Sequence, residues 1–174
     1  TLKQERVSVI TGVNTLFNAL LNKPDFASVD FSSWKVALGG GMAVQKAVAD
    51  RWQQTVGIPL IEAYGLTETS PAASMNPLNL TAYNGSIGLP ISNTEVDIRN
   101  DERQSLPLGE IGELWIKGPQ VMRGYWQRPE DTAKVIDELG FFATGDMAIM
   151  DEKGFIKLVD RKKDMIVVSG FNVY

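Results

Sequence analysis

The hydrophobic pattern changes its period near Gly85, and this change most restricts the fold that the chain can adopt. Before Gly85, short apolar runs alternate with segments whose apolar residues recur every three or four positions, which is typical of strands and amphipathic helices. After Gly85, polar and apolar residues alternate one by one, as in strands with one buried face. The sequence therefore predicts an α/β fold, in which part of a parallel-sheet subdomain is followed by a mostly antiparallel, β-barrel-like subdomain.

The expected elements follow from these two patterns. In the first half we expect strands at 7–10, 34–38 and 58–63, a first helix capped by Asn14, and a second helix with Val44 and Trp52 on its buried face. In the second half we expect strands at 94–98, 112–117 and 155–159, and one short helix with Pro129 in its first turn. The expected domain boundaries are an α/β subdomain at 1–85, a β-rich subdomain at 86–159, a hinge linker at 160–164 and the start of a C-terminal domain at 165–174.

Composition excludes several functional classes. The chain of 174 residues has no Cys and no His, so it cannot form a disulfide, a thiolate zinc site or a Ser-His-Asp triad. Its formal net charge is −4 and no basic face stands out, so we expect no nucleic acid partner. No apolar run approaches the roughly 18 residues that span a bilayer. Because the chain starts at Thr1 and stops soon after a strand-like run, we expect it to be a central fragment of a larger enzyme.

Three polar segments carry the chemistry, and each is expected where a strand ends in a loop: 64–69, 144–146 and 160–164. A purine can stack on Tyr64, a ribose diol can be held by Asp146 and Arg161, and a phosphate-bound metal can be held by Glu68. Each segment also has a simpler reading, as a surface loop, an Asx turn or a solvated charge run. Their occurrence together, in this order, favours a nucleoside triphosphate site.

The same segments, with 10–21, 118–126 and 140–163, resemble the adenylate-forming superfamily of acyl-CoA synthetases, peptide-synthetase adenylation domains and beetle luciferases. The resemblance runs over essentially the whole chain and is strongest for the branch that joins long-chain fatty acids to CoA. It implies a role for each matching residue. By this resemblance, Tyr64 and Gly65 lie against adenine, Asp146 and Arg161 bind ribose, and Thr67 and Glu68 are the catalytic phosphate and magnesium contacts. Gly39, Gly40 and Gly41 lie beside adenine and the substrate carboxylate. Lys163 is the hinge, and Ser169 and Gly170 adjoin the CoA arm.

The resemblance also implies the reaction. A long-chain fatty acid is activated by ATP, with Mg²⁺, through an acyl-adenylate, and then forms a thioester with CoA. The implied location is cytoplasmic, with peripheral association at the inner face of the membrane left open; acyl chain length and oligomeric state are not predicted. The superfamily's phosphate loop and adenylation lysine have no counterpart in the sequence, so we expect the isolated chain to be inactive. The alternatives are an adenylation enzyme directed to amino acids or carrier proteins, an inert nucleotide-binding fragment, and an interaction module.

Overall fold

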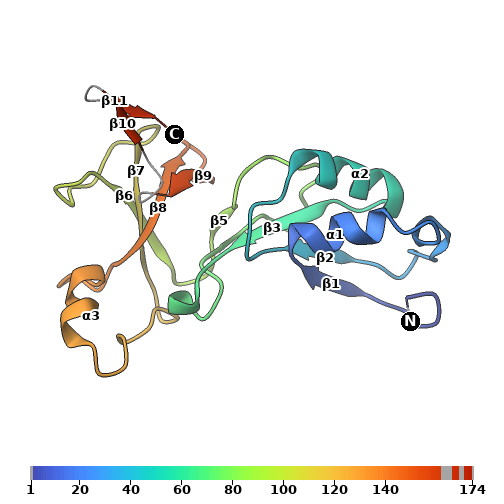
Figure 1. Cartoon of the computed structure of the whole chain (residues 1–174), viewed down its shortest axis with the longest axis horizontal. Coiled ribbons are helices and arrows are strands. Elements are labelled where there is room, and N and C mark those ends of the chain that lie inside the picture. The colour runs from blue at the N-terminus through green and yellow to red at the C-terminus, as the bar shows by residue number, and fades with distance from the viewer. Residues whose placement is uncertain (1, 162–165, 169–170, 174) are drawn as a thin grey trace.

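A computed structural model describes residues 2–161, 166–168 and 171–173 of the chain, and the side chains of residues 2–159. Figure 1 shows two parts side by side, one with α1 and α2 and the other with α3. The elements in the first part are β1 (Val9–Gly12), α1 (Asn14–Leu21), η1 (Phe26–Ser28), β2 (Val36–Gly39), α2 (Lys46–Val56), β3 (Leu60–Tyr64), η2 (Thr67–Thr69), β4 (Ser74–Met75) and β5 (Leu89–Pro90). Those in the second part are β6 (Glu95–Arg99), β7 (Ile111–Lys117), α3 (Pro129–Val135), β8 (Phe142–Met150), β9 (Ile156–Arg161), β10 (Ile166–Val168) and β11 (Phe171–Val173).

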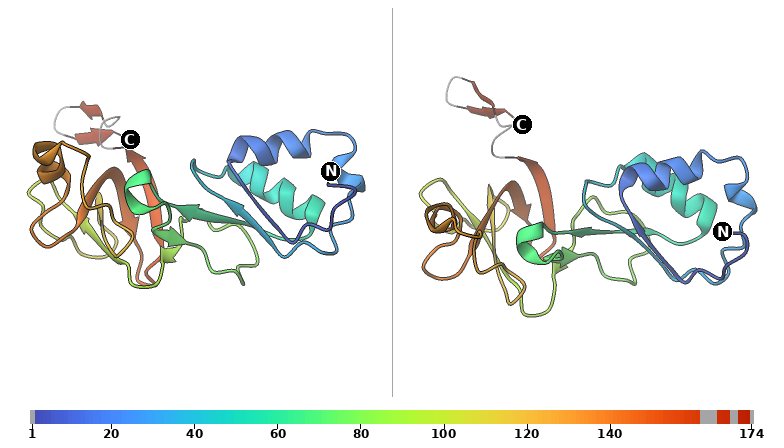
Figure 2. Two further views of the ribbon diagram at one scale, coloured as in Figure 1. Left: turned by 90° about the horizontal axis from the view of Figure 1, so that it is seen from below. Right: turned by 60° about the horizontal axis from the view of Figure 1, so that its bottom comes forward.

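The first part is a five-stranded mixed sheet in the order β1-β2-β3-β4-β5. β1, β2 and β3 are parallel, whereas β4 and β5 pair antiparallel to their neighbours. α1 and α2 lie together over the parallel strands (Figure 2) and bury their apolar faces in one core. Aromatic rings dominate that core: Phe17 meets Trp52 edge to face with ring centroids 4.9 Å apart, and Trp52 lies 5.9 Å from Trp34.

The second part is a four-stranded antiparallel sheet in the order β6-β7-β8-β9. Its buried face carries a separate apolar core that includes Ile98, Leu114, Ile116 and Ala148. β10 and β11 form an antiparallel pair of their own. The sequence prediction of a parallel α/β part followed by a mostly antiparallel part is therefore confirmed.

The two sheets are joined through the backbone of Ile156 in β9. Its N–H donates to the carbonyl of Gly88 (3.0 Å), and its carbonyl accepts both the Ile87 N–H (2.9 Å) and the Ser86 hydroxyl (2.8 Å). Gly88 has φ +92°, and a Cβ there would lie 2.0 Å from the Met75 carbonyl carbon. Only glycine can allow this approach. The antiparallel sheet is therefore held against the end of the mixed sheet by main-chain hydrogen bonds.

Several local predictions were wrong. Asn14 is the first residue of α1 rather than its cap, and its Oδ1 accepts the Gln45 N–H (3.0 Å). Thr144–Asp146 and Arg161 lie within β8 and β9, not in loops after strands. β8 was missed because Thr-Gly-Asp is typical of turns. Strand pairing on both sides overrides that local preference. No helix in the described part of the chain is long and apolar enough to cross a membrane.

Candidate functional site

The candidate site lies where β1, β2 and β3 end. In an open sheet with parallel strands, ligands bind beyond the carboxyl ends of those strands, where the loops leave the backbone exposed. Here those ends carry Thr11 and Gly12 at the end of β1, Gly40 and Gly41 after β2, and Tyr64 to Glu68 from the end of β3 onward. All of these residues line a cavity of about 620 Å³, which we call the outer cavity.

A second cavity of about 410 Å³, the inner cavity, extends toward the antiparallel sheet. Its lining includes Met42, Glu62 and Ile87 from the first part, and Asp146, Leu158 and Val159 from β8 and β9. The two cavities share one wall, made by Gly41, Ala63, Tyr64, Gly65 and Leu66. A ligand that bridges the two sheets therefore has a continuous surface made of glycine and alanine positions, one leucine and one aromatic side chain.

Tyr64 and Asp146 meet directly, although 82 residues separate them in the sequence. The Tyr64 hydroxyl donates to Asp146 Oδ2 at 2.5 Å, and Asp146 is only 7% exposed. In the β8–β9 ladder, Asp146 is the register partner of Arg161. The predicted aromatic face and the two predicted ribose contacts are thus brought to one place by the junction of the sheets.

The turn after β3 is held by a close backbone approach at Gly65 and by hydrogen bonds of the Thr69 hydroxyl. At Gly65, a Cβ would lie 1.5 Å from the carbonyl oxygen of Pro71, so no side chain fits at that position. Thr69 is fully buried, and its hydroxyl donates to the Pro71 carbonyl (2.9 Å) while it accepts the Leu66 N–H (2.8 Å). These contacts fix Thr67 and Glu68 at the rim of the outer cavity.

The glycine-rich loop after β2 is anchored by two polar side chains, the buried Glu62 and the half-buried Tyr83. Glu62 Oε1 accepts the Val44 N–H (3.0 Å), and the Tyr83 hydroxyl donates to the Val44 carbonyl (2.8 Å). Burial raises the pKa of Glu62 to about 7, against the lowering effect of the Val44 hydrogen bond. Gly40 and Gly41 line the outer cavity. Gly39 instead is a buried residue of β2, where a Cβ would lie 2.6 Å from Val44 Cγ2.

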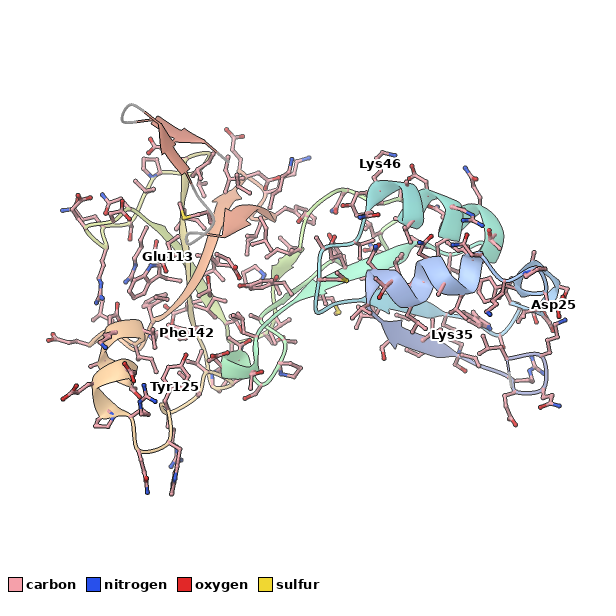
Figure 3. All side chains as sticks on the ribbon, viewed as in Figure 1. Asp25, Lys35, Lys46, Glu113, Tyr125 and Phe142 are labelled. Atoms are coloured by element: carbon pink, nitrogen blue, oxygen red, sulfur yellow. The ribbon has the colours of Figure 1, made fainter. Side chains whose placement is uncertain are left out.

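The Thr144-Gly145-Asp146 segment is fixed from the β7 side. The Thr144 hydroxyl donates to the Leu114 carbonyl (2.8 Å), and the Gly145 N–H donates to Glu113 Oε1 (3.1 Å). Figure 3 labels Glu113 in this region of the antiparallel sheet. Gly145 has φ +74°, which suits glycine and lets the strand present Asp146 to the inner cavity.

Sequence reasoning missed several cavity residues, notably Thr11, Gly12 and Glu62. Thr11 and Gly12 end a parallel strand just as Gly39–Gly41 do, so the same rule could have identified them. Glu62 was hidden because it lies inside a strand. The predicted hinge residue Lys163 and the predicted CoA contacts Ser169 and Gly170 lie outside the described residues, and the side chain of Arg161 is not described.

Known proteins resemble this chain over nearly its whole length. The family model for "AMP-binding enzyme" matches residues 1–126. The chain is 58% identical to a long-chain-fatty-acid–CoA ligase of Yersinia pestis, covering 96% of this chain and 30% of that protein. It is 56% identical to the Haemophilus influenzae protein of the same name, covering 99% and 31%. The chain thus spans about a third of the length of these relatives.

A solved structure shares the fold. The o-succinylbenzoate coenzyme A synthetase MenE of Bacillus subtilis, in complex with ATP and a magnesium ion, superposes with a TM-score of 0.87 at 28% identity. The match covers 99% of this chain and 35% of that one.

Proposed function

Because this chain belongs to the AMP-binding enzyme family, we propose that it forms the nucleotide-binding centre of a long-chain fatty acid–CoA ligase. The observation that carries the proposal is the hydrogen bond between Tyr64 and Asp146, which unites the aromatic and carboxylate parts of an adenosine site across two sheets. The fatty acyl assignment is supported by the identity to the ligases of Yersinia and Haemophilus.

The two cavities suit the two halves of an acyl-adenylate. The inner cavity, with Tyr64 and Asp146, would take the adenosine, with the purine on the Tyr64 ring and the ribose hydroxyls on Asp146 and Arg161. Base stacking of this kind is worth about 1–3 kcal/mol. The outer cavity, with Thr67 and Glu68 at its rim and Leu38, Pro71 and Ala72 in its lining, would take the phosphates and the head of the acid. Gly40 and Gly41 leave the main chain open between them.

In the proposed reaction the fatty acid carboxylate attacks the α-phosphorus of ATP, and pyrophosphate leaves. The carboxylate is ionised at neutral pH, so this step needs no base from the protein. The chain's own residues bind and align the two reactants, which is the main requirement for such a transfer. The thiol of CoA then attacks the acyl carbon and displaces AMP, with Ser169 and Gly170 proposed beside the CoA arm and Lys163 as the hinge between the two steps.

Glu68 fits the magnesium ion that accompanies ATP. The described residues contain no group of three or more His, Cys, Asp or Glu side chains that could hold a metal by themselves. Magnesium is commonly held by one or two carboxylates together with substrate phosphates, so a single carboxylate at the cavity rim is sufficient. When bound, the ion would supply neutralisation of phosphate charge.

The proposal has one direct test. The full-length protein should catalyse pyrophosphate exchange into ATP that depends on a long-chain fatty acid, and should then form acyl-CoA. Glu68→Ala should slow exchange, and Asp146→Ala should weaken ATP binding, with the fold retained. Exchange that depends on an amino acid, or transfer only to a carrier protein, would favour the other branches of the family.

The same proposal divides the chain into an α/β subdomain at 1–85, a β-rich subdomain at 86–159, a hinge linker at 160–164 and the start of a C-terminal domain at 165–174. It also includes inactivity of the isolated chain in acyl-CoA synthesis, and a cytoplasmic location with or without peripheral membrane association.

A further inference from the structure

Tyr125 is held in place by α3. Its N–H donates to the hydroxyl of Thr132 (2.9 Å), and that hydroxyl donates to the Arg128 carbonyl (2.9 Å). The preceding residue, Gly124, has φ +150°, and a Cβ there would lie 2.8 Å from Thr132 Cγ2. The backbone at Tyr125 is therefore packed against α3, which fixes the position from which its side chain extends.

From that point Tyr125 reaches across to Glu68 in η2, 57 residues earlier in the chain. The Tyr125 hydroxyl donates to Glu68 Oε1 (3.0 Å), and three residues before Tyr125 the Met122 N–H donates to the Glu68 carbonyl (2.8 Å). Figure 3 labels Tyr125 beside α3, on the side that η2 approaches. The segment 122–125 of the second part thus forms hydrogen bonds to both the main chain and the side chain of Glu68.

The geometry leaves the carboxylate able to bind a cation. The hydrogen bond from Tyr125 engages Oε1, and Glu68 lines the outer cavity, so a cation there can be bound through Oε2.

We propose that Tyr125 is a positioning residue that holds the Glu68 carboxylate in the orientation in which it binds magnesium accompanying ATP. This inference rests on the proposed nucleotide function. The competing explanation is that the bond only fastens η2 to the second part. Tyr125 is 37% exposed, so a bond of this kind adds little to stability, and its specific target is the carboxylate at the cavity rim.

The test uses the full-length protein and a fluorescent ATP analogue. The Mg²⁺ concentration that gives half-maximal nucleotide binding is measured for the parent and for Tyr125→Phe, which keeps the ring and removes the donor. We expect that concentration to rise about three- to tenfold, as for loss of one ordinary, partly exposed hydrogen bond, with binding measured without Mg²⁺ unchanged. At saturating Mg²⁺ the rate of pyrophosphate exchange should return close to the parental value.

Two further variants make the result specific. Trp126→Ala changes the neighbouring side chain, which is 87% exposed, and should leave the Mg²⁺ requirement at the parental value. In a protein that already carries Glu68→Gln, adding Tyr125→Phe should raise the Mg²⁺ requirement no further. That double-variant comparison separates an effect through Glu68 from a general effect on the fold.

The outcomes distinguish the inference from the function on which it rests. If the parent binds ATP without any response to Mg²⁺ or to Glu68→Gln, the metal role in the proposed function fails, and the inference fails with it. If the parent responds but Tyr125→Phe has an equal or lower Mg²⁺ requirement, the proposed function stands and the positioning role is overturned.

Discussion

At the scale of single residues, the contact between Tyr64 and Asp146 joins two chemical tasks. The ring of Tyr64 offers a stacking face, while its hydroxyl orients a carboxylate that is almost fully buried. A phenylalanine could perform the first task but not the second. The tyrosine is therefore the side chain that ties the geometry of the inner cavity to both sheets.

Tyr64→Phe separates these two tasks. We expect it to weaken ATP binding about three- to tenfold through loss of one hydrogen bond within the site, which is worth about 0.5–1.5 kcal/mol net. Tyr64→Ala should weaken ATP binding further, because stacking worth about 1–3 kcal/mol is also lost. A titration with a fluorescent ATP analogue measures both. If Tyr64→Phe binds ATP as tightly as the parent, the hydroxyl does not prepare Asp146 for the ribose.

Glu62 predicts a pH dependence of stability. Its pKa is about 7 in the folded protein, above the ordinary value of 4.5, so the folded state binds the proton more tightly than the unfolded state. Its contribution is fully present below pH 4.5 and is lost as the pH rises through 7. The free energy of unfolding should fall by about 2–3 kcal/mol over that range on this account.

Glu62→Gln should remove that slope while keeping an acceptor for the Val44 N–H. Urea denaturation of parent and variant at pH 5, 6, 7 and 8 provides the comparison. An identical slope in both proteins would assign the pH dependence to other groups.

At the scale of elements, Arg99 fastens β6 to the segment that leads into β8. Its guanidinium, with 7% of the side chain exposed, bonds Asp97 (2.6 Å) and Asp137 (2.7 Å). It also lies 4.6 Å from the centre of the Trp115 ring and 4.5 Å from that of Phe141. Burial would raise the pKa of Asp137, but the hydrogen bonds from Arg99 and from the Phe141 and Leu139 amides lower it overall. The cation therefore supports the strand that carries Asp146.

Arg99→Met should lower the free energy of unfolding by about 3 kcal/mol, because it leaves two carboxylates without their buried partner. Arg128→Met is the matched control, since Arg128 pairs with Asp131 on the surface with 70% of its side chain exposed. Such surface pairs contribute about 0–1 kcal/mol. Equal losses in the two variants, measured by chemical denaturation, would show that burial of Arg99 is not what makes it stabilising.

Elements with a regular hydrophobic period were predictable from the sequence, within about two residues at their ends. β7 and α3 are examples: the alternating run at 112–117 and the Pro129 start correspond to Ile111–Lys117 and Pro129–Val135. β8 was not predictable in this way, because its Thr-Gly-Asp segment favours a turn locally and becomes a strand only by pairing with β7 and β9. For the same reason the residue types of the site were predictable, whereas the contacts Tyr64–Asp146 and Tyr125–Glu68 depend on distant pairing.

At the scale of the whole molecule, β9 links the antiparallel sheet to the mixed sheet and continues through Arg161. The proposed hinge at 160–164 thus begins within a paired strand. Rotation there would leave the main-chain bonds at Ile156 intact, so the two sheets around the inner cavity would move as one body.

Lys163→Pro tests that hinge in the full-length protein. Proline fixes φ near −65° and restricts the residue before it, so it should hinder a large backbone rotation. We expect pyrophosphate exchange to be retained and thioester formation with CoA to fall. Both reactions are measured on one preparation, and equal loss of both, or of neither, would mean that position 163 is not the pivot.

The wall between the two cavities also bears on how such proteins diversify. Five residues form it, and the residues on its two sides differ: Thr11, Leu38 and Ala72 border only the outer cavity, whereas Asp146 and Val159 border only the inner one. Mutations can therefore reshape the outer side, where we propose that the phosphates and the head of the acid bind, while leaving the proposed adenosine side untouched. If the proposed function holds, changes in the acid that is activated would be concentrated on the outer side of this wall, and the same source of chemical energy would be inherited unchanged.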